Sequence, residues 1–152
     1  MSEPAPFILH RRLQRVALVR LVRTATTPAE VEVMATLLDS LYREAGGPLV
    51  LVAVPASGLS PPSEEVRAAI FKRIKERFAS GKLERAYLIV PTGNLFLRAM
   101  LRSFFTGLRM VLGLQRQLHI ADRIEEVAGE VARVGGIQAA ELIETARELV
   151  GS

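Results

Sequence analysis

Cysteine, histidine and aspartate, which often catalyse reactions or bind metal ions, are scarce in this 152-residue chain. Cysteine is absent, and the only two histidines, His10 and His119, lie far apart in the sequence. The two aspartates, Asp39 and Asp122, lie in or beside segments with the pattern of surface helices. Without cysteine there is no thiolate nucleophile and no thiolate metal site. We therefore expect a protein that is not an enzyme and that has no metal site and no cofactor.

The most regular pattern among the charged residues is a series of arginines in an otherwise almost wholly apolar segment, 94–117. Arg98, Arg102, Arg109 and Arg116 follow one another at intervals of four or seven residues. At about 100° per residue, these side chains lie on one narrow stripe of a helix. We expect the apolar side chains of this helix to be buried on two sides, so that only the arginine stripe reaches water.

Three interpretations of this helix stay open: a core helix with a solvated arginine stripe, a helix that binds another protein, and a helix that lies on anionic lipid. The residues that we expect to contact a protein partner are Arg98, Arg102, Phe105 and Arg109. We do not expect a membrane-spanning helix, because each arginine near the middle of a bilayer costs about 2.5 to 3.5 kcal/mol.

Arginine also dominates the overall charge, because it supplies 17 of the 20 basic residues in a chain of net charge +4. A basic chain can bind nucleic acid, but this sequence has no tryptophan and only two tyrosines to stack on bases, so we expect no nucleic-acid partner. Basic and acidic residues are concentrated in different stretches of the chain. Residues 85–121 hold five arginines and no acidic residue, whereas residues 122–152 hold seven acidic residues and three arginines. These stretches could neutralise each other within one molecule or across a dimer.

Alternating segments of strand and helix character predict an α/β fold. Continuous apolar runs of strand length occur at 49–54 and 86–90, as in interior strands of a parallel sheet. Helix-start signals occur at Thr27, at Ser60 or Ser63, and at Asp122, and each is followed by apolar residues at helical spacing. Further strands are expected at 7–9, 16–22 and 118–120, and further helices at 94–112 and from 137 onward.

We therefore expect a single mixed, largely parallel sheet of four or five strands covered by helices. Residues 1–136 would form this α/β domain, and residues 137–152 an extra C-terminal amphipathic helix. Leu142, Ala146 and Leu149 would dock this helix on the domain or on a second subunit. The first residues, MSEPAPFILHRR, lack the charged-then-apolar layout of a signal peptide, so we expect a cytoplasmic protein.

The order of elements and several stretches of sequence resemble the STAS/SpoIIAA-like superfamily. These stretches are the strand LVLVAV with its Ser-Gly-Leu loop, the strand AYLIV, and the helix DRIEEVAGEVA. The resemblance covers residues 7–134 in topology and concerns bacterial members of the superfamily. The superfamily contains anti-sigma-factor antagonists and relatives of the SEC14 lipid-binding fold, so the resemblance implies a non-enzymatic interaction module.

In the antagonists, a serine in an Asp-Ser-Ser-Gly-Leu loop is phosphorylated, and the added charge disrupts a partner interface. The matching loop here is Pro55-Ala56-Ser57-Gly58, followed by Leu59, and it lacks the aspartate. The resemblance therefore implies Ser57 as the phosphoacceptor, and the alternative is an ordinary turn serine.

Three functions follow from these observations. The first is a regulatory or scaffolding module of STAS-like type that binds another protein, either as a monomer or as a homodimer. The alternative is a peripheral lipid or membrane-surface binding protein of SEC14-like type, which needs an apolar pocket near the helix at 94–112. The third is an enzyme, which needs a cleft lined by titratable groups.

Overall fold

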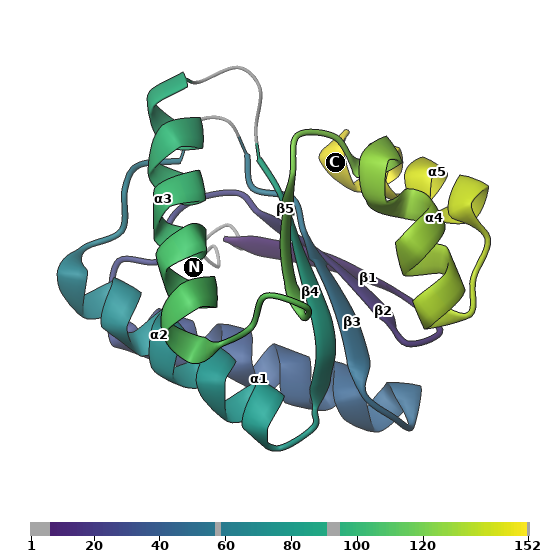
Figure 1. Ribbon diagram of the computed structural model, residues 1–152, viewed down its shortest axis with the longest axis horizontal. Coiled ribbons are helices and arrows are strands. Elements are labelled where there is room, and N and C mark those ends of the chain that lie inside the picture. Colours follow the sequence, from purple (N-terminus) through teal and green to yellow (C-terminus); the bar gives the residue numbers. More distant parts are fainter. Residues whose placement is uncertain (1–6, 57–58, 91–94, 152) are drawn as a thin grey trace, which may run out of the picture.

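The computed structural model describes residues 7–56, 59–90 and 95–151 as five strands and five helices (Figure 1). The strands are β1 (Ile8–Leu13), β2 (Val16–Leu21), β3 (Leu49–Ala53), β4 (Leu83–Ile89) and β5 (Leu118–Ala121). The helices are α1 (Pro28–Ala45), α2 (Glu64–Ala79), α3 (Leu95–Leu112), α4 (Ile124–Gly135) and α5 (Ala139–Val150). The expected fold class, a mixed and largely parallel sheet with helices and an extra C-terminal helix, is confirmed.

The five strands form one sheet in the order β1-β2-β3-β4-β5. β1 pairs with β2 antiparallel, and the other neighbours pair in parallel. β1 is longer than the strand expected at 7–9, because it continues through the exposed polar residues 10–12 at the edge of the sheet. An edge strand can be held by backbone pairing to one neighbour, so these residues carry no apolar signal.

Helices cover both faces of the sheet: α1, α2 and α3 lie on one face, and α4 and α5 on the other (Figure 1). The first three helices connect successive parallel strands, and right-handed crossovers between strands in sequential order all pass over the same face. α4 follows the last strand and returns over the opposite face, where α5 packs beside it.

The interior strands are apolar along their length because both of their faces are covered. In β2, Val16 and Leu18 pack in the core under α4 and α5, whereas Ala17 packs in the core on the other face. The approach of α4 to β2 is especially close at Gly135, where a Cβ atom would lie 2.3 Å from Cγ2 of Val16. Only glycine fits this packing without displacing Val16.

Two of the three predicted helix-start signals are confirmed. The hydroxyl groups of Thr27 and Ser63 each accept a hydrogen bond from a backbone N–H in the first turn of α1 and α2. The third prediction, that Asp122 caps α4, is wrong. The residue before α4 is Arg123, which makes no side-chain capping bond, and Asp122 is instead bound by side chains of α3.

α5 packs on its own chain through the face that the amphipathic pattern indicated. Leu142, Ala146 and Leu149 are at most 5% exposed, and they belong to the same core as buried residues of β2, β3 and β4. One continuous core therefore joins residues on both sides of position 136.

Candidate ligand-binding site between α2 and α3

α3 leaves much of its apolar surface exposed. Its buried residues are Leu97, Leu101 and Leu108. Its exposed large apolar residues are Leu95, Phe96, Met110 and Val111, each at least 67% exposed. The expectation that only the arginine stripe of this helix reaches water is therefore wrong. The reason is that the sheet covers one side of α3, while the outward side of the helix has no neighbour within the described chain.

An apolar cavity of about 170 Å³ lies between the sheet and helices α1, α2 and α3. Leu51 and Ala53 of β3 form part of its floor, and Leu101 and Phe105 of α3 form part of its roof. Most of the other lining side chains are aliphatic or aromatic. Leu51 and Ala53 are only partly buried, although they belong to an interior strand. Their partial exposure is explained by the cavity, which they face.

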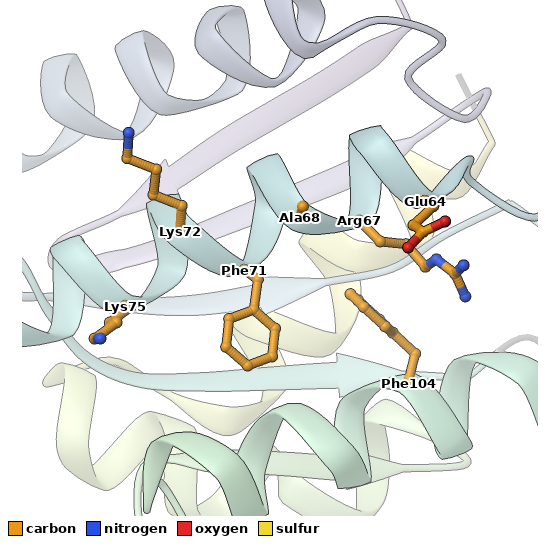
Figure 2. Close-up of a pocket in the computed structure, with 7 residues that line it drawn as sticks. All are labelled: Glu64, Arg67, Ala68, Phe71, Lys72, Lys75 and Phe104. Atoms are coloured by element: carbon orange, nitrogen blue, oxygen red, sulfur yellow. The ribbon is translucent and has the colours of Figure 1, made fainter.

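A larger groove, of about 590 Å³, lies outside the cavity between α2 and α3 (Figure 2). The residues that line it are Glu64, Arg67, Ala68, Phe71, Lys72 and Lys75 of α2 and Phe104 of α3. Figure 2 shows Phe71 and Phe104 reaching toward each other from the two helices, while Lys72 extends away from α3. The groove therefore has an aromatic centre with basic side chains along α2.

Phe104 lies where the groove and the cavity meet. It lines the cavity, the groove and a third hollow of about 170 Å³ at the same place. The third hollow shares Met100 and Leu101 with the cavity, and it shares Arg67 with the groove. Phe104 thus forms a common wall of the groove at Arg67 and of the apolar space beneath α3.

The groove carries an excess of positive charge. Within the part of the chain that the structure describes, neither Arg67 nor Lys75 forms a salt bridge, whereas Arg73 on the same helix is paired with two glutamates. Among the described residues that line the groove, Glu64 is the one acidic residue. The basic groups of Arg67 and Lys75 can therefore bind an anionic ligand without breaking an ion pair within the described chain.

The four residues expected to bind a protein partner are all at least partly buried within the chain. Arg98 and Arg102 both donate hydrogen bonds to the Asp122 carboxylate, and the bond from Arg102 is the main cause of the lowered pKa of Asp122. Phe105 is half-buried and packs against the core under α3. Arg109 is half-buried, with its Nε atom enclosed. Their role in binding a partner stays a prediction.

The remaining candidate residues do not come together. Ser57 lies outside the described residues, so its role as phosphoacceptor stays a prediction. His10 is exposed on β1, whereas His119 on β5 stacks on Tyr87 with 5.0 Å between ring centroids. Burial is the main cause of the raised pKa of Tyr87. Among the described residues, no group of three histidine, aspartate or glutamate side chains is placed to hold a metal ion.

The sequence did not indicate the groove, because its two walls come from helices that are separated along the chain by β4. The available signal was an aromatic residue, Phe71, among the basic residues Arg67, Lys72 and Lys75 of one helix. That pattern is equally typical of an ordinary surface helix.

Helices long and apolar enough to cross a bilayer do not occur in the described residues. Comparisons of the chain with protein-family models, with curated proteins and with solved structures found no match.

Proposed function

We propose that this chain is a non-enzymatic binding module for a small amphipathic anion, a molecule with one apolar group and one acidic group. The proposal is carried by the adjacency of the groove between α2 and α3 and the apolar cavity, which share the side chain of Phe104 as a wall. The apolar group lies in the cavity, and the acidic group lies in the groove near Arg67 and Lys75. This function is a form of the SEC14-like alternative, with a smaller ligand than a membrane lipid.

The size of the cavity limits the apolar group. A volume of about 170 Å³ is close to that of an engineered cavity of about 150 Å³ that binds benzene. One aromatic ring or a short acyl chain therefore fits, and a longer chain has to continue into the groove. Each buried methylene contributes about 0.8 kcal/mol, so a group of this size supplies most of the binding free energy.

The basic residues of the groove determine which head group is preferred. Arg67 offers a planar guanidinium that can bind a carboxylate or phosphate through two hydrogen bonds. The groove is open to solvent, so an ion pair there is worth only about 0 to 1 kcal/mol. We therefore expect the apolar group to set the affinity and the charge to set the selectivity among ligands with the same apolar group.

The non-enzymatic role is supported by the separation of the two histidines and by the absence of cysteine from the chain. A cytoplasmic location is part of the proposal, because a chain without cysteine needs no oxidising compartment. In this role the bound anion would change how α3 packs, since α3 forms both the roof of the cavity and one wall of the groove.

The proposal can be tested with three ligands that share one tail: octanoate, octanol and octylamine. In calorimetric titrations we expect octanoate to bind most tightly, octanol less tightly, and octylammonium least. Arg67→Glu should abolish the preference for octanoate over octylammonium, because the groove is then lined by two acidic and two basic residues. Arg133→Glu, the same charge change at an exposed position of α4 on the other face of the sheet, should leave the order unchanged. Equal affinities for the three ligands, or no saturable binding, would refute the proposal.

A second candidate function is a regulatory or scaffolding protein-interaction module of STAS-like type. It is favoured by the large apolar residues at both ends of α3, which are at least 67% exposed. Exposed apolar side chains on one element are typical of protein interfaces. A regulatory partner that binds the purified chain should lose affinity with Phe96→Glu but not with Val33→Glu on α1, and equal binding to both variants would count against this candidate.

A further inference from the structure

The outward face of α3 is uncharged and open to solvent. Leu95 and Phe96 near its first turn are 79% and 71% exposed, and Met110 and Val111 near its last turn are 67% and 74% exposed. Between the two pairs, the exposed residues of this face are Ala99, Ser103 and Gly107, all of them small. A face of this kind exposes apolar surface that a second protein surface can cover.

These residues share one side of the helix. At about 100° per residue, Phe96, Ser103 and Met110 fall within about 40° of one another. Leu95 and Val111 flank this line on either side. The small residues near the line allow another helix to approach closely between the two apolar ends.

The arrangement is symmetric about Ser103. Phe96 lies seven residues before Ser103, and Met110 lies seven residues after it. Leu95 and Val111 lie eight residues before and after the same position. If two copies of α3 pack antiparallel with Ser103 opposite Ser103, each Phe96 meets Met110 of the second copy, and Leu95 and Val111 lie at the two edges of the contact.

We propose that the outward face of α3 binds the same face of a second copy of this chain, as an antiparallel helix pair with its two-fold axis at Ser103. A two-fold dimer requires a self-complementary surface, and the placement of large residues at both ends and small residues between them meets that requirement. The single helix pair gives a small interface, so the dimer is reversible and depends on concentration.

The charges of α3 favour a second copy of this chain, and not a membrane or a nucleic acid, as the partner of its outward face. A helix on anionic lipid or on phosphate groups needs basic side chains around the face that binds. In α3, Arg98 and Arg102 are turned toward Asp122 at the end of β5, and both are bound to its carboxylate. The outward face itself has no charged residue, so a second uncharged apolar face matches it.

The absence of native cysteine makes cysteine cross-linking a direct test of the geometry. Under oxidising conditions we expect Ser103→Cys to form a covalent dimer, because this residue meets its own copy at the axis. Phe96→Cys alone should stay monomeric on a denaturing gel, whereas the double variant Phe96→Cys, Met110→Cys should cross-link. Val33→Cys, at an exposed position of α1, is the control and should not cross-link.

Sedimentation equilibrium of the unmodified chain over a dilution series provides the second measurement. We expect a mass that rises from 16.7 kDa toward twice that value with concentration, and a Ser103→Glu variant that stays at the lower value with an unchanged circular-dichroism spectrum. A monomer at every concentration would overturn the proposal. Cross-linking of Phe96→Cys alone would also overturn it, because that result indicates a parallel pair.

Discussion

Ala53 is the position at which one substitution can probe the cavity beneath α3. It lies on β3, lines the cavity, and is only partly buried although its strand is in the interior of the sheet. Ala53→Leu extends three further carbon atoms into this space. We expect the variant to be more stable than the wild type and to bind octanoate more weakly, because the leucine occupies part of the volume that the ligand needs.

The expected gain in stability follows from the size of the added group. Burying a methylene contributes about 0.8 kcal/mol, so three carbon atoms set an upper limit of about 2.4 kcal/mol. Imperfect fit lowers this gain, and we expect about 1 to 2 kcal/mol. In a domain of this length, 1 kcal/mol corresponds to about 2 to 4 °C, so Tm should rise by about 2 to 8 °C.

Urea denaturation followed by circular dichroism measures the free energy of unfolding directly. A matched control is Ala128→Leu on α4, where the alanine is 2% exposed in the close-packed core on the other face. Overpacking there should destabilise the fold by about 1 to 3 kcal/mol. The change from alanine to leucine should thus raise the free energy of unfolding at position 53 and lower it at position 128. Only Ala53→Leu should lower the octanoate affinity, by tenfold or more.

Two results would refute this reasoning. If Ala53→Leu destabilises the fold as much as Ala128→Leu does, there is no free volume at Ala53. If Ala53→Leu is stabilising but octanoate binds with unchanged affinity, the cavity exists and is not the binding site.

Three further predictions concern the fold. The pKa of Glu30 is lowered to about 2, mainly by the hydrogen bond from Arg23. The ionised Glu30 side chain therefore stabilises the fold fully above its ordinary pKa of about 4.5, and this stabilisation is lost as the pH falls toward 2. Glu30→Gln should therefore flatten the pH dependence of urea denaturation between these values, and an unchanged profile would contradict the assigned ion pair. Gly135→Ala should lower the free energy of unfolding by about 1 to 3 kcal/mol, because the added methyl group meets Val16, and a wild-type urea midpoint would show that α4 and β2 are not so close. Leu142→Ala should cost about 2 to 5 kcal/mol in the same assay, whereas a cost below 1 kcal/mol would mean that α5 is not part of the core.

Local sequence patterns predicted the elements of the fold well. The runs LVLVA and AYLI have no polar alternation because both faces of each strand are covered. This apolar pattern lies within the strand's own residues, so it can be read from the sequence. The starts of α1 and α2 were predictable for the same reason, since a capping hydroxyl and the N–H group that it binds are neighbours in sequence. The second half of β1 was missed because edge pairing leaves no apolar pattern.

Features that depend on how distant elements meet were not predictable. Asp122 has the sequence context of a helix cap, but α3 brings Arg98 and Arg102 to it from 24 and 20 residues away, which gives the carboxylate different partners. The cavity has no sequence signature, because it is the volume that side chains from several helices and strands leave unfilled. The exposure of the outward face of α3 also depends on the absence of a neighbouring element, and periodicity alone does not report that absence.

The most direct test of the proposed binding site is solution NMR of the chain with octanoate. We predict intermolecular NOEs between the terminal methyl group of octanoate and the methyl groups of Leu51 and Leu101. We also predict NOEs between the methylene group next to the carboxylate and the side chains of Phe104 and Arg67. NOEs confined to Phe96 and Met110 on the outward face of α3, or none at all, would contradict the proposal that the ligand occupies the groove between α2 and α3 and the cavity beneath α3.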